Sequence, residues 1–147
     1  MQVINKQWFE VVVQYAATGE NGDDILTKER QAIDAMSFTE AEERAVRAAK
    51  GHTDVVIKSE IQAPYSEILA DSTQGDVFYK ATVQFSVTNE KTGKIKRSNS
   101  VLLVQSGSIA GVMNSIDEYL KASMADWEII SIAKTKVAGY YIAEESK

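Results

Sequence analysis

Residues 8–15 have the sequence Trp-Phe-Glu-Val-Val-Val-Gln-Tyr, and residues 79–85 have the sequence Tyr-Lys-Ala-Thr-Val-Gln-Phe. In both stretches apolar side chains occupy every second position, which is the period of a β-strand with one buried face. Each stretch is followed by a segment rich in turn-forming residues, 19–24 in the first case and 90–94 in the second. The two stretches therefore predict the first strands of two β-hairpins.

A helix and a further strand follow each predicted hairpin. Residues 37–40, Ser-Phe-Thr-Glu, form a capping box, in which the serine and glutamate side chains satisfy free backbone N–H groups at the start of a helix. Ser106 or Ser108 precedes a second segment with apolar residues at helical spacing, residues 109–120. The repeated order predicts an α+β fold made of duplicated ββαβ units, with the two helices packed on one face of an antiparallel sheet.

The predicted duplication divides the chain without breaking it into independent domains. At one common offset Val13 aligns with Val83 and Ile25 aligns with Ile95. We expect a single domain over residues 1–147, with these parts: a first ββαβ repeat at 8–63, a linker at 64–76, a second repeat at 77–135 and a C-terminal tail at 136–147.

Two helices cannot cover both faces of a six-stranded sheet. The uncovered face is either polar or packed against another subunit. The large apolar side chains that could form such a surface are Trp8, Val12, Phe78 and Trp127. The alternative for each of them is an ordinary place in the core.

Composition excludes several classes of protein. The chain has 147 residues, of which 44% are hydrophobic, and no cysteine, so it predicts a globular fold without disulfides or thiol chemistry. Its net charge of −5 argues against extended nucleic-acid binding, which needs a basic face. No apolar run approaches the roughly 18 to 20 residues of a membrane span, and the first residues do not resemble a secretion signal. We expect a cytoplasmic protein.

The residue inventory also argues against most kinds of catalysis. His52 is the single histidine, and with no cysteine the chain cannot assemble a histidine-rich metal site or a Cys-His pair. A position beside Gly51 predicts a surface turn for His52. We therefore expect no enzyme, no cofactor and no metal, with a carboxylate-dependent phosphodiesterase using Asp71, Asp76 or Asp126 as an alternative.

The two predicted hairpin turns differ in charge. Basic residues surround the second turn, namely Lys91, Lys94, Lys96 and Arg97, whereas acidic residues surround the first, namely Glu20, Asp23 and Asp24. The opposite signs suggest that one hairpin meets an anionic ligand or an acidic neighbour, the alternative being two solvated turns. In the tail, Lys136, Tyr140 and Tyr141 suit stacking on a base or packing at an interface.

Several short motifs resemble a family of short proteins from Bacteroidota and their phages, a domain of unknown function. The motifs are Trp8-Phe-Glu-Val, Ser37-Phe-Thr-Glu-Ala-Glu42, Ser66-Glu-Ile68, Met124-Ala-Asp-Trp-Glu-Ile129 and Ser131-Ile132. The resemblance spans nearly the whole chain. It implies an origin and a size, and it assigns no catalytic residues.

The first functional hypothesis is a non-enzymatic, phage-encoded binding protein. It would form a homo-oligomer and sequester a nucleotide-derived defence signal in pockets between subunits. Arginine forks suit phosphate and aromatic rings suit bases, so the candidate ligand-binding residues are Arg30, Arg44, Arg47, Tyr65, Arg97 and Trp127. The alternative is a protein-binding or structural adaptor that has no small ligand.

Overall fold

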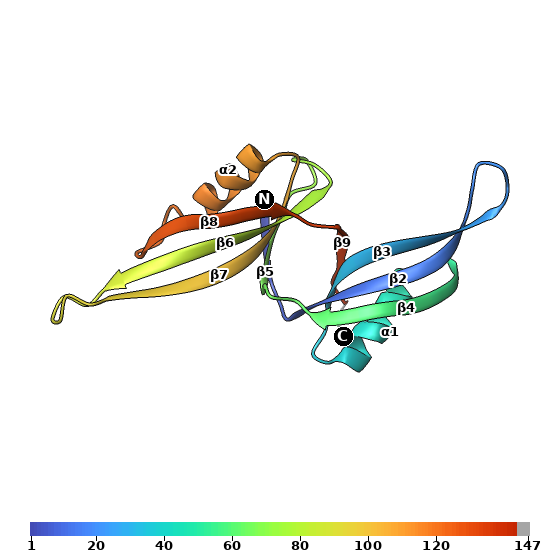
Figure 1. Ribbon diagram of the computed structural model, residues 1–147, viewed down its shortest axis with the longest axis horizontal. Helices are drawn as coiled ribbons and strands as arrows, with labels where there is room; N and C mark the ends of the chain where they lie inside the picture. The colour runs from blue at the N-terminus through green and yellow to red at the C-terminus, as the bar shows by residue number, and fades with distance from the viewer. Residues whose placement is uncertain (144–147) are drawn as a thin grey trace. The chain divides into compact units, whose positions relative to one another are not determined.

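A computed structural model describes residues 1–143 (Figure 1). These residues form two α-helices and nine β-strands, so the expected α+β class is confirmed. The strands belong to two sheets, and the chain divides into two compact units. Unit 1 consists of residues 1–5 and 65–135, and unit 2 consists of residues 6–64 and the segment from Lys136 onward.

Unit 2 is a four-stranded sheet with one helix against it. Its elements are β2 (Trp8–Thr18), β3 (Asp24–Asp34), α1 (Phe38–Ala48), β4 (Thr53–Gln62) and β9 (Val137–Tyr141). The strand order is β4-β2-β3-β9. The two strands of the β2–β3 hairpin are antiparallel, β4 is antiparallel to β2, and β9 is parallel to β3.

Unit 1 is a five-stranded sheet with the second helix. Its elements are β1 (Gln2–Asn5), β5 (Glu67–Ala70), β6 (Val77–Thr88), β7 (Ile95–Ser106), α2 (Ile109–Leu120) and β8 (Asp126–Lys134). The strand order is β1-β5-β7-β6-β8, and β5 is parallel to β7. Each sheet therefore combines an antiparallel ββαβ part with one parallel neighbour.

Each unit has its own hydrophobic core between helix and sheet. In unit 2, Phe9, Val11 and Val13 of β2 are buried with the small residues Ala41 and Ala45 of α1. In unit 1, alternate residues of β6 are buried with larger aliphatic side chains of α2, Val112 and Ile116. The alternation predicted for both first strands is thus the pattern that builds the two cores.

The sheet arrangement differs from the expected antiparallel sheet with both helices on one face, because there are two mixed sheets with one helix each. Three strands were not anticipated: β5 lies within the expected linker at 64–76, β9 lies within the expected tail at 136–147, and β1 precedes both repeats. They are four or five residues long, and β5 and β9 pair in parallel with distant strands. Such pairing leaves no local turn signal in the sequence.

The two ββαβ parts correspond closely in their pairing. The neighbours β4-β2-β3 in one sheet match β8-β6-β7 in the other. The central strand of each carries a register shift at the same place, between Val12 and Val13 in β2 and between Thr82 and Val83 in β6. Duplication of the sequence itself stays a prediction, and the matching shifts provide a register in which to compare the units.

The side chains considered for a subunit interface are largely engaged within the chain. Trp8 and Phe78 are 1% and 2% exposed, so neither offers a free surface. Trp127 packs against the unit 1 core, and Val12 is partly buried on the sheet face opposite α1. Among the described residues, neither helix has the length and apolar character needed to cross a membrane.

Candidate functional site

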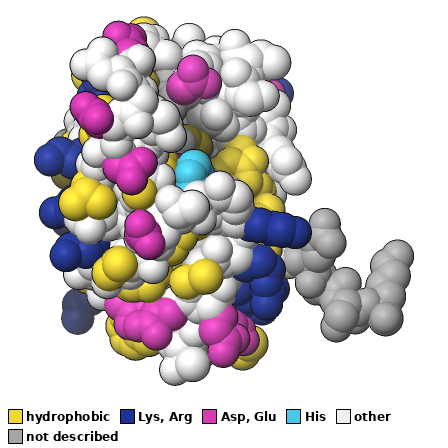
Figure 2. Space-filling view, turned by 90° about the vertical axis from the view of Figure 1, so that its right-hand side faces the viewer, with side chains coloured by type: hydrophobic (Ala, Val, Ile, Leu, Met, Phe, Trp, Pro, Cys, Tyr) yellow, Lys and Arg dark blue, Asp and Glu magenta, His cyan; other side chains and the backbone are white. Residues whose placement is uncertain are grey.

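A hollow of about 180 Å³ opens between α1 and the sheet of unit 2. Its lining combines an apolar floor with polar and aromatic walls, formed by Val13, Tyr15, Glu29, Gln31, Ala45, Ala48, Ala49, His52, Tyr140 and Tyr141. Figure 2 shows the single histidine, in cyan, recessed in the surface beside apolar side chains. We call this hollow the α1 pocket.

Small residues make room for the α1 pocket. Ala45 and Ala48 of α1 and Ala49, the residue that caps its end, line the pocket, and none of them carries a side chain beyond Cβ. On the opposite side, a Cβ added to Gly139 of β9 would lie 3.0 Å from Oε1 of Gln31. Glycine at this position therefore lets the Gln31 side chain lie close against the neighbouring strand.

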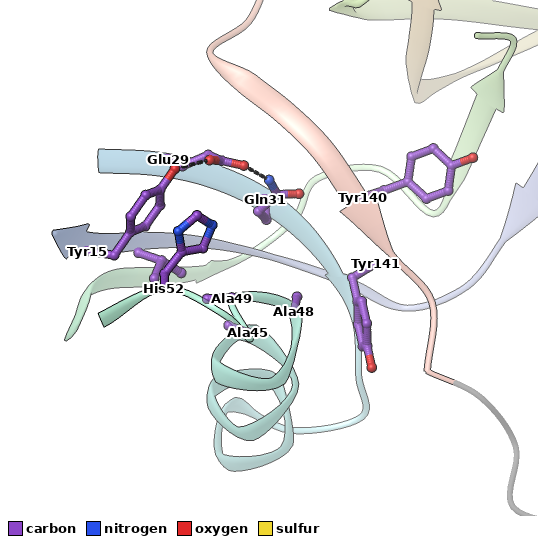
Figure 3. A pocket seen from close by; sticks show the side chains of 10 residues that line it. Tyr15, Glu29, Gln31, Ala45, Ala48, Ala49, His52, Tyr140 and Tyr141 are labelled. Carbon is purple, nitrogen blue, oxygen red and sulfur yellow. Dashed lines mark hydrogen bonds between the residues drawn. The ribbon is translucent and has the colours of Figure 1, made fainter. Parts of the chain in front are cut away.

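A carboxylate with two hydrogen-bond donors stands at the polar side of the pocket. The Tyr15 hydroxyl donates to Oε2 of Glu29 over 2.9 Å, and Nε2 of Gln31 donates to Oε1 of the same carboxylate (Figure 3). The hydrogen bond to Glu29 raises the pKa of Tyr15, with burial as a smaller cause. Both contacts fix the orientation of the Glu29 side chain.

His52 lies over Tyr15 at the rim of the pocket. The two rings are stacked, with centroids 3.9 Å apart and planes inclined by 24°. Gly51 precedes His52 with φ of +99°, a conformation that favours glycine and turns the chain after α1. His52 is exposed, as its predicted surface turn required, and it also contributes to the pocket wall.

The two tyrosines of β9 point to different sides of the sheet. Figure 3 shows the Tyr141 ring beside α1, whereas the Tyr140 ring points away from Tyr15 and His52. The Tyr140 ring instead meets Trp8 edge to face, with centroids 6.3 Å apart. Only Tyr141 therefore offers its ring to the α1 side of the sheet.

Unit 1 has different chemistry at the matching positions. Opposite the shifted valine, unit 2 has Glu29 where unit 1 has Ser100. Two pairs further along the sheet, and therefore on the same face, unit 2 has Gln31 where unit 1 has Leu102. Two residues after that valine stand Tyr15 in unit 2 and Phe85 in unit 1. The hydrogen-bonded carboxylate is therefore particular to unit 2 and is not a requirement of the ββαβ fold.

The negative charge of Glu29 in the α1 pocket is not balanced by a lysine or arginine in the lining. Glu29 lines the hollow, and none of the lining residues is a lysine or an arginine. Its two neutral donors leave further lone pairs of the carboxylate for a third partner. A pocket of this kind accepts hydrogen bonds from a cation, and its aromatic walls suit the attached carbon atoms.

The arginines predicted in the first half do not share a pocket. Arg30 forms an ion pair of 3.1 Å with Glu10 on the sheet face opposite α1. Arg44 is bound to Glu40 at 3.0 Å and donates to the backbone oxygen of Asp34. Arg47 is exposed in the last turn of α1. Arg30 and Arg44 thus have structural partners, and neither lines the α1 pocket.

The three predicted site residues of the second half belong to unit 1. Tyr65 is buried, Arg97 is exposed on β7 near the hairpin turn, and Trp127 packs against the unit 1 core. The six predicted residues are therefore divided between the two units. The structure does not bring them together as one cluster within either unit.

Of the three carboxylates proposed for metal-dependent catalysis, Asp71 has a local structural role. Asp71 accepts hydrogen bonds from the Thr73 hydroxyl and backbone N–H and lies 3.5 Å from the amino terminus. The hydrogen bonds from Thr73 lower the pKa of Asp71. Within residues 1–143, no three acidic or histidine side chains are grouped so that they could hold a metal ion.

Sequence reasoning missed Tyr15, Glu29 and Gln31 as a site. The available signal was the presence of two polar residues on the face of β3 that opposes Val11 and Val13. That face had to be buried because its partners are apolar. Two long polar side chains there indicate either an edge of the core or a polar cavity within it.

The chain belongs to the family described as Domain of unknown function (DUF4494), whose model matches residues 7–143. The match covers every strand and helix except β1, in agreement with the resemblance expected over nearly the whole chain. No curated protein matches the sequence, and no solved structure matches the fold.

Proposed function

We propose that the protein is a non-enzymatic binding protein that holds a small amine-bearing ligand in the α1 pocket. The observation that carries the proposal is the oriented Glu29 carboxylate in a hollow without a lysine or arginine in its lining. A protonated amine would donate to the free lone pairs of Glu29, and the Tyr15, His52 and Tyr141 rings would pack against its carbon atoms.

The size of the pocket limits the ligand. Its volume of about 180 Å³ lies below the range of about 300–1,000 Å³ that is usual for drug-sized ligands. The occupant is therefore a small amine, or the amine end of a larger molecule that continues into solvent. A nucleotide-derived signal would fit this site only if it carried an amine group, because the Glu29 carboxylate would repel its phosphates.

A titration of the purified protein tests the proposal. The ligands compared are the amines ethylamine, agmatine and spermidine and the nucleotides AMP and ADP-ribose, each by calorimetry and by thermal unfolding. A ligand that binds only the folded state raises the melting temperature. At least one amine should bind and both nucleotides should not; binding of a nucleotide with indifference to every amine would contradict the assigned ligand class.

A charge-neutral substitution identifies the site. Glu29→Gln keeps the side-chain size and removes the charge, so we expect amine affinity to fall about 10- to 100-fold, the value of a charge-assisted hydrogen bond. Glu43→Gln makes the same charge change on the exposed surface of α1 and should leave affinity unchanged. Equal losses in the two variants would show a diffuse electrostatic effect and no site.

The protein-binding adaptor is the second candidate function. The observation in its favour is the set of large apolar side chains exposed on the strands of both units, including Val56, Ile61 and Ile130. An adaptor would show no effect of small ligands on melting. The cytoplasm is the proposed place of action in either case, since a chain without cysteine gains nothing from an oxidising compartment.

A further inference from the structure

The β2–β3 and β6–β7 hairpins each extend well past the helix of their own unit (Figure 1). Glu20, Asp23 and Asp24 surround the first turn, and we call them the acidic tip. The residues around the second turn, which we call the basic tip, are Lys91, Lys94, Lys96 and Arg97. Both groups are exposed. The two tips therefore present opposite charges on similar projecting scaffolds.

Within residues 1–143, the charges of the two tips have no ion-pair partners. The ion pairs of the described residues involve the amino terminus, Arg30 and Arg44, and none of them involves a tip residue. The acidic tip contains no basic residue, and Glu90 is the single carboxylate beside the four cations of the basic tip. Each tip therefore keeps nearly its full charge for an external partner.

Both tips also expose large apolar side chains at their bases. Ile25 and Leu26 beside the acidic tip are 54% and 67% exposed. Val87 and Ile95 beside the basic tip are 57% and 52% exposed. Isolated exposed apolar residues are ordinary, but the end of each hairpin exposes two of them, and Ile25 and Leu26, which are consecutive in β3, point to opposite faces of their hairpin.

A hollow lies at the basic tip, and the backbone beside it forms a defined turn. An open hollow of about 590 Å³ is bordered by Val87, Asn89, Thr92, Lys94, Ile95 and Lys96. The Asn89 N–H donates to the Lys94 oxygen over 2.8 Å, and Gly93 takes the positive φ of +72° that the turn needs. The hollow is therefore open to solvent and bordered by exposed apolar and lysine side chains on a turn with a defined backbone.

We propose that the acidic tip of one copy of the chain docks on the basic tip of a second copy. The occupant is a second copy because the same chain carries the complementary charge, together with exposed apolar side chains at both tips. Ile25 or Leu26 would enter the hollow between Val87 and Ile95, and Asp23 and Asp24 would face its lysines. Because every copy has one tip of each kind, the contact is head-to-tail, and it generates either a closed ring or an open filament.

Native mass as a function of salt is the first measurement. Analytical ultracentrifugation of the full chain at micromolar concentration should give a mass above that of one copy in about 0.02 M salt. In about 0.5 M salt the mass should fall toward that of one copy, because exposed charges are then largely screened. A single-copy mass at both salt concentrations, up to about 100 µM protein, would overturn the proposal.

Charge reversal provides a sharper test, because the two tips can be exchanged. Asp23→Lys with Asp24→Lys leaves a chain with two basic tips, and Lys94→Glu with Lys96→Glu leaves one with two acidic tips. Each variant alone should have the mass of one copy. An equimolar mixture should associate again, because every basic tip then finds an acidic tip on the other variant.

A matched control excludes an effect of net charge. Lys50→Glu with Lys58→Glu makes the same change in net charge as Lys94→Glu with Lys96→Glu, but at exposed positions outside both tips, and should leave the native mass as it is in the unmodified chain. Substitutions at exposed turn positions leave the fold intact, which circular dichroism checks. Retained association of either reversed variant alone, or no association in their mixture, would contradict docking between the tips.

Discussion

Glu60 of β4 is a side chain whose ionised form lowers the stability of the folded protein. Its Oε2 atom is buried without a hydrogen-bond partner, and α1 brings Glu42 close to it. Burial raises the pKa of Glu60, and the neighbouring charge of Glu42 raises it further. Two ionised carboxylates can only accept hydrogen bonds, so neither can satisfy the other.

Glu60→Gln should therefore stabilise the protein at neutral pH. The amide removes one charge and can donate to Glu42, and we expect a gain of about 0.5 to 1 kcal/mol in the free energy of unfolding. A raised pKa in the folded state means that ionisation of Glu60 destabilises the fold as pH rises through that pKa. The gain should hence shrink near pH 4, where the carboxyl holds its proton.

Urea unfolding at pH 7 and pH 4 measures the effect of Glu60→Gln. Glu43→Gln is the control, because Glu43 is exposed on α1 and the substitution makes the same change in charge. A loss of stability at pH 7 would contradict the assigned repulsion, and would show that Glu60 has a favourable contact as an anion.

Tyr119 gives unit 1 a sensitivity to alkali. Its hydroxyl donates to Glu67 of β5, and burial together with this hydrogen bond raises the pKa of Tyr119 to about 12. The unfolded chain loses the same proton near pH 10. The folded state therefore binds more protons between these values, and the stability from Tyr119 is present below pH 10 and is lost as pH rises toward 12.

Tyr119→Phe should flatten this alkaline decline. We expect the variant to be less stable than the unmodified chain by about 1 kcal/mol at pH 8 and to lose less of its remaining stability between pH 10 and 11. Chemical unfolding followed at both pH values measures the difference. Equal slopes for the two proteins would show that Tyr119 keeps an ordinary pKa.

At the scale of elements, both helices begin at the serines that the sequence indicated. The Ser37 hydroxyl accepts from the Glu40 N–H over 3.1 Å, and the Glu40 carboxylate accepts in return from the Met36 N–H over 3.0 Å. At α2, the Ser108 hydroxyl accepts from the Gly111 N–H over 3.0 Å. The glycine at this position offers no side chain for a return bond.

The difference between the caps predicts different sensitivities. Ser37→Ala and Ser108→Ala should each cost about 1 kcal/mol of stability. Glu40→Ala should add a further loss at α1, because it removes both the return bond and the ion pair with Arg44. Thermal unfolding of the three variants measures this, and Glu43→Ala on the exposed side of α1 is the control.

Local signals explain what could be predicted of the elements. The capping serines and the alternating strands at 8–15 and 79–85 are defined by neighbours in the sequence, and the structure has them where they were expected. The short strands β5 and β9 are defined by parallel partners far along the chain, so no local pattern marks them. A sequence read segment by segment assigns such strands to linkers and tails.

The candidate site was harder to predict for the same reason. Tyr15 was expected on the apolar face of its strand, and it does lie there, but its hydroxyl bonds to Glu29 on the neighbouring strand. Tyr141 also lines the pocket, although it is far from Glu29 in the sequence and lies on the last strand of the described chain. Of the arginines that were favoured for their chemistry, Arg30 and Arg44 instead bind nearby carboxylates.

At the scale of the whole molecule, each unit is completed by a segment from outside its own ββαβ part. Strand β1, from the start of the chain, pairs with β5 in unit 1. Strand β9, from the end of the described chain, pairs with β3 in unit 2. The contiguous repeats expected at 8–63 and 77–135 are thus the antiparallel parts of two units that exchange their outer strands.

Because β9 pairs with β3, we expect residues 137–141 to determine how well the β2–β3 hairpin is protected from local unfolding. A chain that ends at Thr135 lacks β9, so β3 loses its parallel neighbour and the α1 pocket loses Tyr141. We expect amide exchange to accelerate about tenfold or more in β3, since backbone groups that β9 had covered become an open edge. The strands of unit 1 keep all of their own partners and should exchange as before.

Hydrogen exchange resolved by segment compares this truncation with a chain that ends at Ala143 and retains β9. The longer chain should keep the protection of β3 and the amine binding proposed for the α1 pocket, and the shorter one should lose both. If β3 stays protected after removal of β9, the hairpin is stable on its own pairing with β2. If unit 1 also loses protection, the two units unfold as one cooperative structure, and the loss of one strand is transmitted through the chain.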